Sequence, residues 1–504
     1  MENNNINTKP QSFASGLRKI FCPIESYELK KFLPMALMMA CILFNYSMFR
    51  SVKDGLVVTE VGSEAISFVK LYIVLPSAIL FMIIYTKLCN KFSYNQVFYI
   101  VLSVFIGFFA LFTFMFYPNP DFFHPNPAII EDLASRYVKL QWFIKLFGKW
   151  TYVLFYTFSE LWGSVVLSLL FWGFANKITK TNEAKRFYSM FGMLGNIALI
   201  FVGLLADVLL DENFKMFPEA IKLTPLLACA LISGVIIMIL FRWINNNVLT
   251  DPSLYDPDAS SKKKKKAKLS LSESFKMIFS SKYLGLLVTL VIAYGISIIL
   301  VEGVWKDKLR ELYPNRNDYT KFMAQFQIYQ GSVAILFMLI GSNILRRVSW
   351  MTAAIFTPVM IFITGVAFFS FIFFDSTLGM YVSGIIGIGP LVMVAWIGVI
   401  QNVLSKATKY SLFDSTKEMA YIPLDDEMKT KGKSAVDVVG GRLGKSGGGL
   451  IISTFFLLFQ DYNFKQATPY FAGFFFVIVI LWIFAVIGLS KEYNKAMLEN
   501  QSSN

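Results

Sequence analysis

Long apolar runs are the feature that most constrains the fold of this chain. Twelve stretches, each about as long as a helix that crosses a bilayer, alternate with polar segments. Only 16% of the residues are charged, whereas soluble domains carry about a quarter. The sequence therefore predicts an all-α polytopic membrane protein with about 12 transmembrane helices. The predicted spans are 32–49, 66–86, 96–117, 149–174, 187–210, 222–244, 283–302, 326–345, 350–374, 377–402, 436–460 and 468–489.

A polar, basic connector at 245–282 divides these runs into two sets of six. Its densest part, Lys262–Lys266, lacks the interleaved aromatic residues that stack on bases, so we expect no nucleic acid partner. With the N-terminus in the cytoplasm, the inside segments carry about twice as many Lys and Arg as the outside segments. The predicted units are two cytoplasmic tails (1–31 and 490–504), the cytoplasmic connector (245–282) and two six-helix halves (32–244 and 283–489).

The two halves share short sequence matches. Val52-Lys53-Asp54-Gly55-Leu56 ends the first run, and Trp305-Lys306-Asp307-Lys308-Leu309 ends the seventh. A similar match relates the glycines of the fifth run to those of the eleventh. Two parallel six-helix halves would produce such correspondences. We therefore expect a major-facilitator-like fold with a central cavity between the halves.

Enzyme and metal chemistry find little support in the sequence. The four cysteines are scattered, and with the single His124 they form neither a metal-binding spacing nor a disulfide framework. A membrane-embedded enzyme or a lipid-handling scaffold would need a polar catalytic cluster at an interface, which the sequence does not contain. We expect a transporter with no cofactor and no metal.

Cations inside a predicted span are the first candidate binding groups. Val438–Leu450 carries Arg442 and Lys445 among glycines, and buried cations are costly unless an anion meets them. The string GGRLGKS imitates a phosphate loop, but Val439 stands where that loop requires glycine, and no strand precedes it. We reject the phosphate-loop interpretation and expect the glycines to allow close approach of a ligand or a neighbouring helix.

Acids and cations in other spans complete the candidate site. Glu160 has apolar sequence on both sides, and Glu302 ends its span beside Trp305, where an interfacial position is the alternative. Arg50 and Lys53 share one helix face, with interfacial snorkelling as their alternative. Lys70 and Asp207 lie near span ends and are expected to serve structure.

The predicted substrate-binding set therefore combines cations and acids from both halves. A polyanion with an aromatic body suits it, because Lys and Arg bind phosphates and aromatic rings stack on a base. The set is Lys53, Glu160, Glu302 and Lys445, with Arg442 and Arg50 beside them and Tyr46, Phe49 and Tyr156 as candidates for base stacking.

At these residues the sequence resembles the ATP/ADP translocase family, the non-mitochondrial nucleotide transporters of obligate intracellular bacteria and plastids. The match runs along nearly the whole chain and is closest to the rickettsial exchangers at GGRLGKSGG. The motifs that carry it are RSVKDGLVVTE (50–60), SELWG (159–163), EAKRFYSMFG (183–192), LVEGVWK (300–306), LIGSNILRRVSW (339–350), NVLSKATKYSLFDSTKEMAYIPL (402–424) and GGRLGKSGG (440–448).

The resemblance implies import of host ATP in exchange for ADP, with phosphate as a candidate companion of ADP. It also implies a multi-pass protein of the bacterial inner membrane, and we expect a monomer. Charges important for transport in the family match Lys53, Glu160, Glu302 and Lys445. The motif KYSLFDSTKEMAYIPL is expected at the cytoplasmic gate. The alternative is a proton-coupled or exchange importer of other nucleotides, such as GTP, CTP, UTP or NAD.

Overall fold

The computed structural model describes the backbone of residues 24–179, 181–214, 216–255, 271–425, 428 and 432–502. Some side chains within these ranges also lie outside the description. They are those of residues 181, 182, 184, 185, 189, 271, 272, 274, 275, 342–346, 434, 438, 442, 445 and 500–502.

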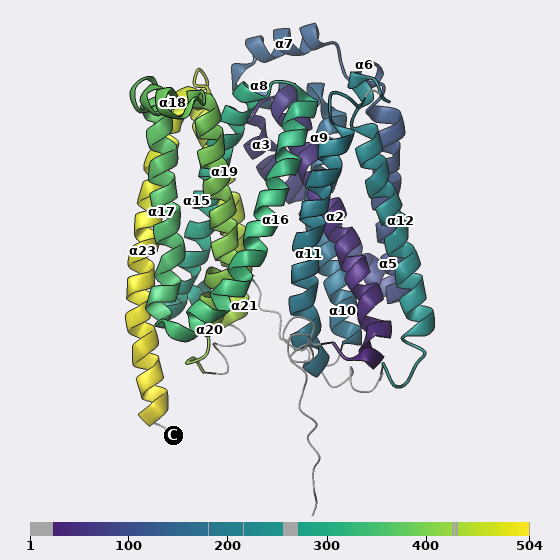
Figure 1. Ribbon diagram of the computed structural model, residues 1–504, viewed down its shortest axis with the longest axis vertical. Coiled ribbons are helices and arrows are strands. Elements are labelled where there is room, and N and C mark those ends of the chain that lie inside the picture. The colour runs from purple at the N-terminus through teal and green to yellow at the C-terminus, as the bar shows by residue number, and fades with distance from the viewer. Residues whose placement is uncertain are drawn as a thin grey trace, which may run out of the picture.

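The N-terminal half is a bundle of helices that run along the long axis of the molecule (Figure 1). Several of its helices contain π-helical turns, such as η2 between α3 and α4. The elements are α2 (Leu29–Glu60), α3 (Ala65–Phe68), η2 (Val69–Val74), α4 (Leu75–Lys91), α5 (Tyr94–Leu111), η3 (Phe112–Phe116), α9 (Trp150–Trp162), η5 (Gly163–Phe171), α10 (Trp172–Ile178), α11 (Thr181–Leu209) and α12 (Thr224–Asn247).

The C-terminal half forms a second bundle beside the first (Figure 1). Its elements are α14 (Leu271–Ser280), α15 (Lys282–Leu312), α16 (Arg316–Arg347), α17 (Trp350–Phe373), η7 (Asp375–Gly379), α18 (Met380–Ile386), α19 (Pro390–Thr408), η8 (Lys409–Phe413), α20 (Asp414–Met419), α21 (Lys433–Ala435), η10 (Val436–Gly440), α22 (Gly441–Leu458) and α23 (Phe464–Ser502).

The two ends of the molecule differ. The start of α2 and the end of α23 lie at one end, here called the terminal end (Figure 1). The opposite, distal end carries the short helices α6 (Pro120–Phe123), α7 (Pro127–Arg136) and α8 (Gln141–Gly148). These helices occupy the long polar segment between the third and fourth predicted spans.

Eleven helices among the described residues are long and apolar enough to cross a membrane. The one remaining predicted span, 436–460, is the eleventh in order and contains α22, whose apolar part Ser446–Leu458 is shorter. The predicted span 377–402 has the wrong limits. Gly387 and Gly389 interrupt it, and the long helix begins at Pro390 and continues to Met419. The motif expected at a gate therefore begins inside this helix.

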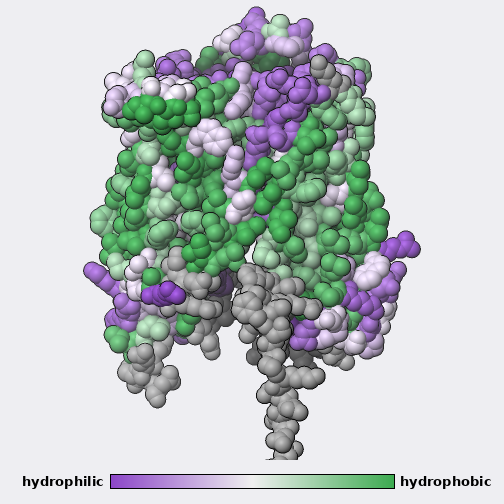
Figure 2. All heavy atoms as spheres, viewed as in Figure 1, coloured by the Kyte–Doolittle hydropathy of each residue, from purple (hydrophilic) through white to green (hydrophobic). Residues whose placement is uncertain are grey.

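The outer surface matches a membrane environment. Figure 2 shows hydrophobic residues over the middle of the helical bundles, with hydrophilic residues gathered toward both ends. On α4, for example, Ile79, Leu80 and Ile83 are all more than half exposed. Large apolar side chains on a helix surface need an apolar solvent, so this band is the surface that faces lipid.

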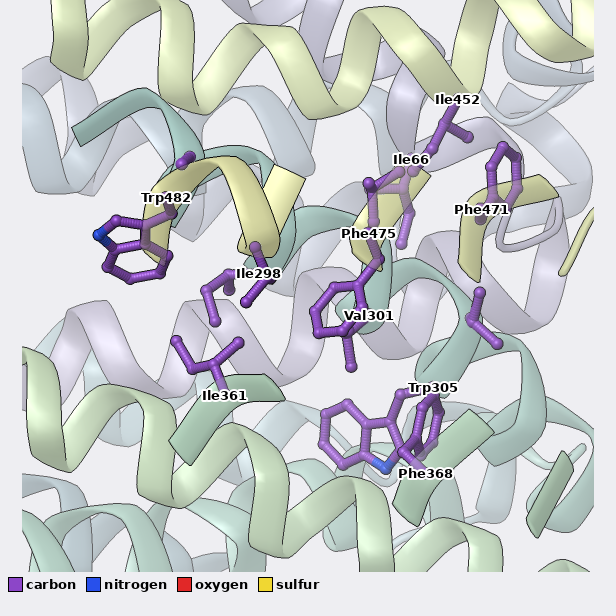
Figure 3. Packing of buried hydrophobic residues seen from close by; sticks show 14 of the residues in the cluster. Ile66, Ile298, Val301, Trp305, Ile361, Phe368, Ile452, Phe471, Phe475 and Trp482 are labelled. Atoms are coloured by element: carbon purple, nitrogen blue, oxygen red, sulfur yellow. The ribbon is translucent and has the colours of Figure 1, made fainter. Parts of the chain in front are cut away.

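Each half packs around its own apolar core. The core of the C-terminal half includes Trp305 on α15, Phe368 on α17 and Phe475 on α23 (Figure 3). Ile66 of α3 joins this core, although α3 belongs to the N-terminal half. The segment after α2 therefore reaches across to α22, and the two halves share one packed region.

Glycines bring helices of opposite halves close together. A methyl group at Gly203 of α11 would lie 2.7 Å from the carbonyl oxygen of Ala324 on α16. At Gly331 of α16 it would lie 2.7 Å from the carbonyl oxygen of Asn196 on α11. At Gly55 of α2 it would lie 2.0 Å from Oγ1 of Thr320. Small residues permit such approach in a membrane, where van der Waals packing drives helix association.

Candidate functional site

Alternating acids and cations form a chain of ion pairs across the two halves. Glu160 Oε1 of α9 lies 2.8 Å from Lys53 Nζ of α2, which lies 3.1 Å from Asp54 Oδ1. Lys306 Nζ of α15 lies 2.9 Å from Asp54 Oδ2 and 3.1 Å from Glu302 Oε1. Arg50 Nη2 of α2 ends the chain, 3.3 Å from Glu302 Oε1. The pairs Lys306–Asp54 and Arg50–Glu302 connect the halves.

The chain is buried and balanced in charge. It comprises three cations (Arg50, Lys53 and Lys306) and three carboxylates (Asp54, Glu160 and Glu302). The side chains of Asp54 and Lys306 are 0% and 2% exposed, whereas that of Glu160 is 30% exposed. Because each charge has an opposite charge within reach, the chain avoids the cost of isolated ions at membrane depth.

Helical spacing and packing position these groups. Arg50, Lys53 and Asp54 are three and four residues apart on α2 and thus share a face. Glu302 and Lys306 are four residues apart on α15 and pair along one face. Next to Lys306, Trp305 donates a hydrogen bond from Nε1 to the carbonyl oxygen of Ala395, 2.9 Å away. Its ring packs on Gly398, which fixes α15 against α19.

Asp54 and Lys306 are central residues that the predicted set omits. The internal repeat was the signal that could have found them, since it aligns Lys53 with Lys306. In the structure both lysines contact Asp54, and each has a glutamate on a neighbouring turn or helix. The repeat partner of Asp54, Asp307, instead accepts a hydrogen bond from Ser63 Oγ, 2.6 Å away.

The other predicted site residues have different placements. Lys445 and Arg442 lie in the first turns of α22, and their side chains are outside the described set. Tyr156 lies under Lys53, whose Nζ is 3.9 Å from the ring centroid. Tyr46 packs against Gly163. Phe49 stacks on Phe109 at 3.8 Å in the core, which supports a packing role for it.

The glycines of the motif at 440–448 contact a neighbouring helix. A methyl group at Gly295 of α15 would lie 2.5 Å from the carbonyl carbon of Gly444 on α22. At Gly448 it would lie 2.7 Å from Cβ of Ile299. This contact brings the helix that carries Arg442 and Lys445 against the helix that carries Glu302 and Lys306.

A second polar network joins the halves at the distal end. Glu60 of α2 meets Lys149 at 2.9 Å and Arg316, at the start of α16, at 3.5 Å. Lys321 of α16 lies 3.2 Å from Asp211, just beyond α11. Toward the terminal end, the ion pairs of the described residues lie within one half, such as Lys31–Glu183 and Lys417–Asp437.

Metal binding finds no support in the part of the chain that the structure describes, because no group of three or more metal-ligating side chains occurs there. The charged cluster instead offers ammonium and guanidinium groups, which bind phosphate or carboxylate oxygens.

Comparison with known proteins identifies the kind of molecule to which this cluster belongs. The family model described as TLC ATP/ADP transporter matches residues 7–493. The chain belongs to the TLC ATP/ADP transporter family. It is thus a transporter and not an enzyme.

Relatives of this TLC-family protein match over almost their whole length. It is 60% identical to "ADP,ATP carrier protein 1" of Rickettsia bellii, over 96% of this chain and 98% of the relative. It is 58% identical to "ADP,ATP carrier protein 1" of Rickettsia prowazekii, over 98% and 99%. It is 46% identical to "ADP,ATP carrier protein 3" of Rickettsia bellii, over 96% and 99%.

Solved structures confirm the fold class of this family member. A bacterial homologue of the iron transporter ferroportin, in an inward-facing state, aligns with a TM-score of 0.57 at 14% identity over 93% of this chain and 100% of that one. The xylose transporter XylE from E. coli, in a partially occluded inward open conformation, aligns with a TM-score of 0.50 at 12% identity over 93% and 98%. The major-facilitator-like fold predicted from the sequence is therefore confirmed.

Proposed function

We propose that this protein exchanges ATP for ADP across a membrane and binds the phosphates at the buried chain of ion pairs between its halves. The observation that carries the proposal is the charge-balanced chain from Glu160 to Arg50. Its cations already hold carboxylate oxygens, and phosphate oxygens accept the same charge-assisted hydrogen bonds. The names of the rickettsial relatives point to the same pair of nucleotides.

Nucleotide binding would work by competition with the carboxylates. Phosphate oxygens displace Glu160 from Lys53 and Glu302 from Arg50 and Lys306. The displaced contacts include the pair Arg50–Glu302, which connects the two halves. Binding therefore loosens one connection between the halves and replaces it with a ligand that both halves hold. Lys445 and Arg442 of α22 would add further phosphate contacts, and Tyr156 and Tyr46 are the candidates for contact with the base.

Alternating access follows from rocking the halves around this fixed site. The described polar contacts between halves lie at the charge chain and the distal end, which supports a conformation closed at the distal end. The distribution of Lys and Arg supports a cytoplasmic terminal end. The rickettsial origin of the relatives supports a location in the bacterial inner membrane. The distal network of Glu60, Lys149 and Arg316 must then break when the site opens to the other side.

Counterflow in proteoliposomes tests the proposal. Vesicles that contain the purified protein and internal ADP should accumulate radiolabelled ATP, and vesicles without internal nucleotide should not. Unlabelled ADP should compete with uptake more strongly than GTP, CTP, UTP or NAD. Labelled phosphate inside the vesicles shows whether phosphate leaves with ADP. Uptake that depends on a pH gradient and is not stimulated by internal ADP would contradict the proposal.

Two variants connect the function to the site. Lys53→Met and Glu160→Gln remove the two partners of one pair and should each abolish exchange. Lys308→Met is the matched control, because the ion pair that the structure describes for Lys308 is with Glu311 of the same helix, 2.8 Å away. If Lys53→Met exchanges ATP for ADP at the normal rate, the charge chain is not the phosphate site.

A further inference from the structure

Two lysines beside the chain of ion pairs have no carboxylate partner among the residues that the structure describes. All other lysines whose side chains the structure describes as buried or half-buried have a carboxylate oxygen within 4.0 Å. The exceptions are Lys70 and Lys406. A lysine that lies inside a membrane protein without a counterion is costly and marks a functional position.

Lys406 is the more deeply buried of the two. It lies on α19 in the C-terminal half and is 8% exposed. Its Nζ donates a hydrogen bond to Oε1 of the neutral side chain of Gln330, 2.9 Å away. The same Nζ lies 5.2 Å from the ring centroid of Phe326. Neither contact neutralises the charge. Arg50 and Glu302 of the chain of ion pairs are among the charged groups that act on it electrostatically.

Lys70 approaches the same chain from the N-terminal half. It lies on η2, a π-helical turn, and such turns occur frequently at functional sites. Together with Glu302 and Lys306 it lines a small cavity between α3, η2, α15 and α22, with a volume of about 20 Å³. Glu302 therefore lies between cations of both halves, and its carboxylate occupies the position that an anion would take.

With Lys70 and Lys406 included, the charged cluster is no longer balanced. The six residues of the chain sum to zero, so Lys70 and Lys406 leave a net charge of +2 on the described side chains. Polyphosphates of ADP and ATP carry at least this much negative charge. A bound phosphate chain would supply the counterions that the described residues do not provide.

We infer that Lys70 and Lys406 bind phosphoryl oxygens of the transported anion, one lysine from each half. This inference rests on the proposed function. It replaces the structural role expected for Lys70 from its place near a span end. It also gives each half its own contact with the anion. A site between two halves that rock against each other requires such contacts from both sides. Free phosphate offers the same oxygens as a nucleotide, so the experiment must separate these two sources.

The test uses binding to the purified full-length protein in detergent. Lys70→Met and Lys406→Met keep most of the side-chain volume and remove the charge. Isothermal titration calorimetry measures the affinity of each variant and of the wild type for ATP, ADP and inorganic phosphate. Each Met variant should bind the anion whose oxygens the lysines contact at least tenfold more weakly than the wild type does. Weaker ATP and ADP binding identifies the nucleotide phosphates as the source. Weaker binding of inorganic phosphate alone identifies a separate phosphate site.

Thermal unfolding without ligand separates a binding role from a structural role. Removing an uncompensated buried charge should leave the melting temperature unchanged or raise it, while affinity falls. Lys70→Arg and Lys406→Arg keep the charge and should retain binding within a few-fold. Lys321→Met is the control, because Lys321 pairs with Asp207 and Asp211 at the distal end and should not affect affinity.

Two outcomes would overturn the inference. Normal affinity of both Met variants for all three ligands excludes the lysines from the site. A lower melting temperature with lost binding in both the Met and the Arg variants assigns them a structural role. If the wild-type protein neither binds nor exchanges nucleotides, the proposed function itself fails, and this outcome is distinct from the other two.

Discussion

At the scale of single residues, Lys306 connects the two halves electrostatically. It lies 2.9 Å from Asp54 of α2 and 3.1 Å from Glu302 of its own helix. Lys306→Met leaves two buried carboxylates short of a partner, which costs about 3–5 kcal/mol of unfolding free energy. We expect a lower melting temperature in detergent and loss of ATP/ADP exchange in proteoliposomes.

A second variant separates the electrostatic cost from the binding role. Asp54→Asn combined with Lys306→Met removes both charges of the pair, so stability should recover in part while exchange stays absent. Lys308→Met is again the control, since its partner Glu311 is 43% exposed and such pairs contribute about 0–1 kcal/mol. A Lys306→Met protein that melts and exchanges like the wild type would contradict this account.

His124 is the only histidine of the chain and makes a separate prediction about pH. Burial, and then the nearby charge of Lys149, lower its pKa to about 4. Its Nε2 lies 2.6 Å from Thr151 Oγ1. An unfolded histidine has a pKa near 6.5, so the folded protein binds this proton less readily than the unfolded chain does.

The stability due to neutral His124 is therefore complete above about pH 6.5 and is lost as the pH falls toward 4. We expect the melting temperature of the wild type to fall more between pH 7 and pH 5 than that of His124→Gln, which cannot take up the proton. Thermal unfolding of both proteins across this range measures the difference. Parallel pH profiles would show that His124 contributes nothing.

Burial arguments alone predicted part of the site and missed the rest for a physical reason. Glu160 and Glu302 stand out because apolar sequence surrounds them. Asp54 and Lys306 lie at the ends of their apolar runs, where charges are normal, and only their tertiary contacts reveal that both are buried. The repeat that aligns Lys53 with Lys306 contained this information, but it does not state which acid each lysine contacts.

At the scale of helices, the approach of α15 to α22 depends on two glycines in contact. A side chain at Gly295 would meet the backbone of Gly444 at 2.5 Å, and a backbone cannot move aside as a flexible side chain can. Gly295→Ala should therefore separate the helices, lower the melting temperature and reduce exchange. Detergent thermal unfolding and counterflow measure both effects.

Gly441 is the matched control on the same motif. Among the described atoms outside its own helix, a methyl group there would meet none within 4 Å. Gly441→Ala should therefore be neutral or stabilising by up to about 1 kcal/mol through helix propensity. If Gly295→Ala is also neutral, the contact with Gly444 does not set the helix separation.

Helix limits were less predictable than helix number. Hydropathy located the runs but joined 377–402 across Gly387, which has a positive φ of 75° and ends α18. It also ended that run too early, because the polar residues from Ser405 onward continue the helix to Met419. Buried polar positions such as Lys406 end an apolar run in the sequence without ending the helix in the fold.

At the scale of the whole molecule, the long apolar runs and their repeat predicted a major-facilitator-like fold, which the solved structures confirm. The conformation could not be predicted, because a transporter sequence must permit closure at either end. The described polar contacts between the halves, from the charge chain to Glu60 and Arg316, lie in the distal part of the molecule. The sequence permits several conformations, and the places of these contacts in three dimensions indicate the one closed at the distal end.

Exchange by rocking halves requires the distal contacts to separate in every cycle, and a cross-link there should stop transport. Ser63 and Asp307 belong to opposite halves, with Oγ and Oδ1 2.6 Å apart. A short bifunctional methanethiosulfonate should join the cysteines of a Ser63→Cys/Asp307→Cys protein, made without the four natural cysteines, through two reducible disulfide bonds. ATP/ADP exchange in proteoliposomes should then fall to background and return after reduction. Lys308→Cys/Glu311→Cys, within α15, controls for modification alone and should remain active. Normal exchange by the fully cross-linked Ser63–Asp307 pair would show that these two segments stay together throughout the cycle, and the rocking motion would then need a different hinge.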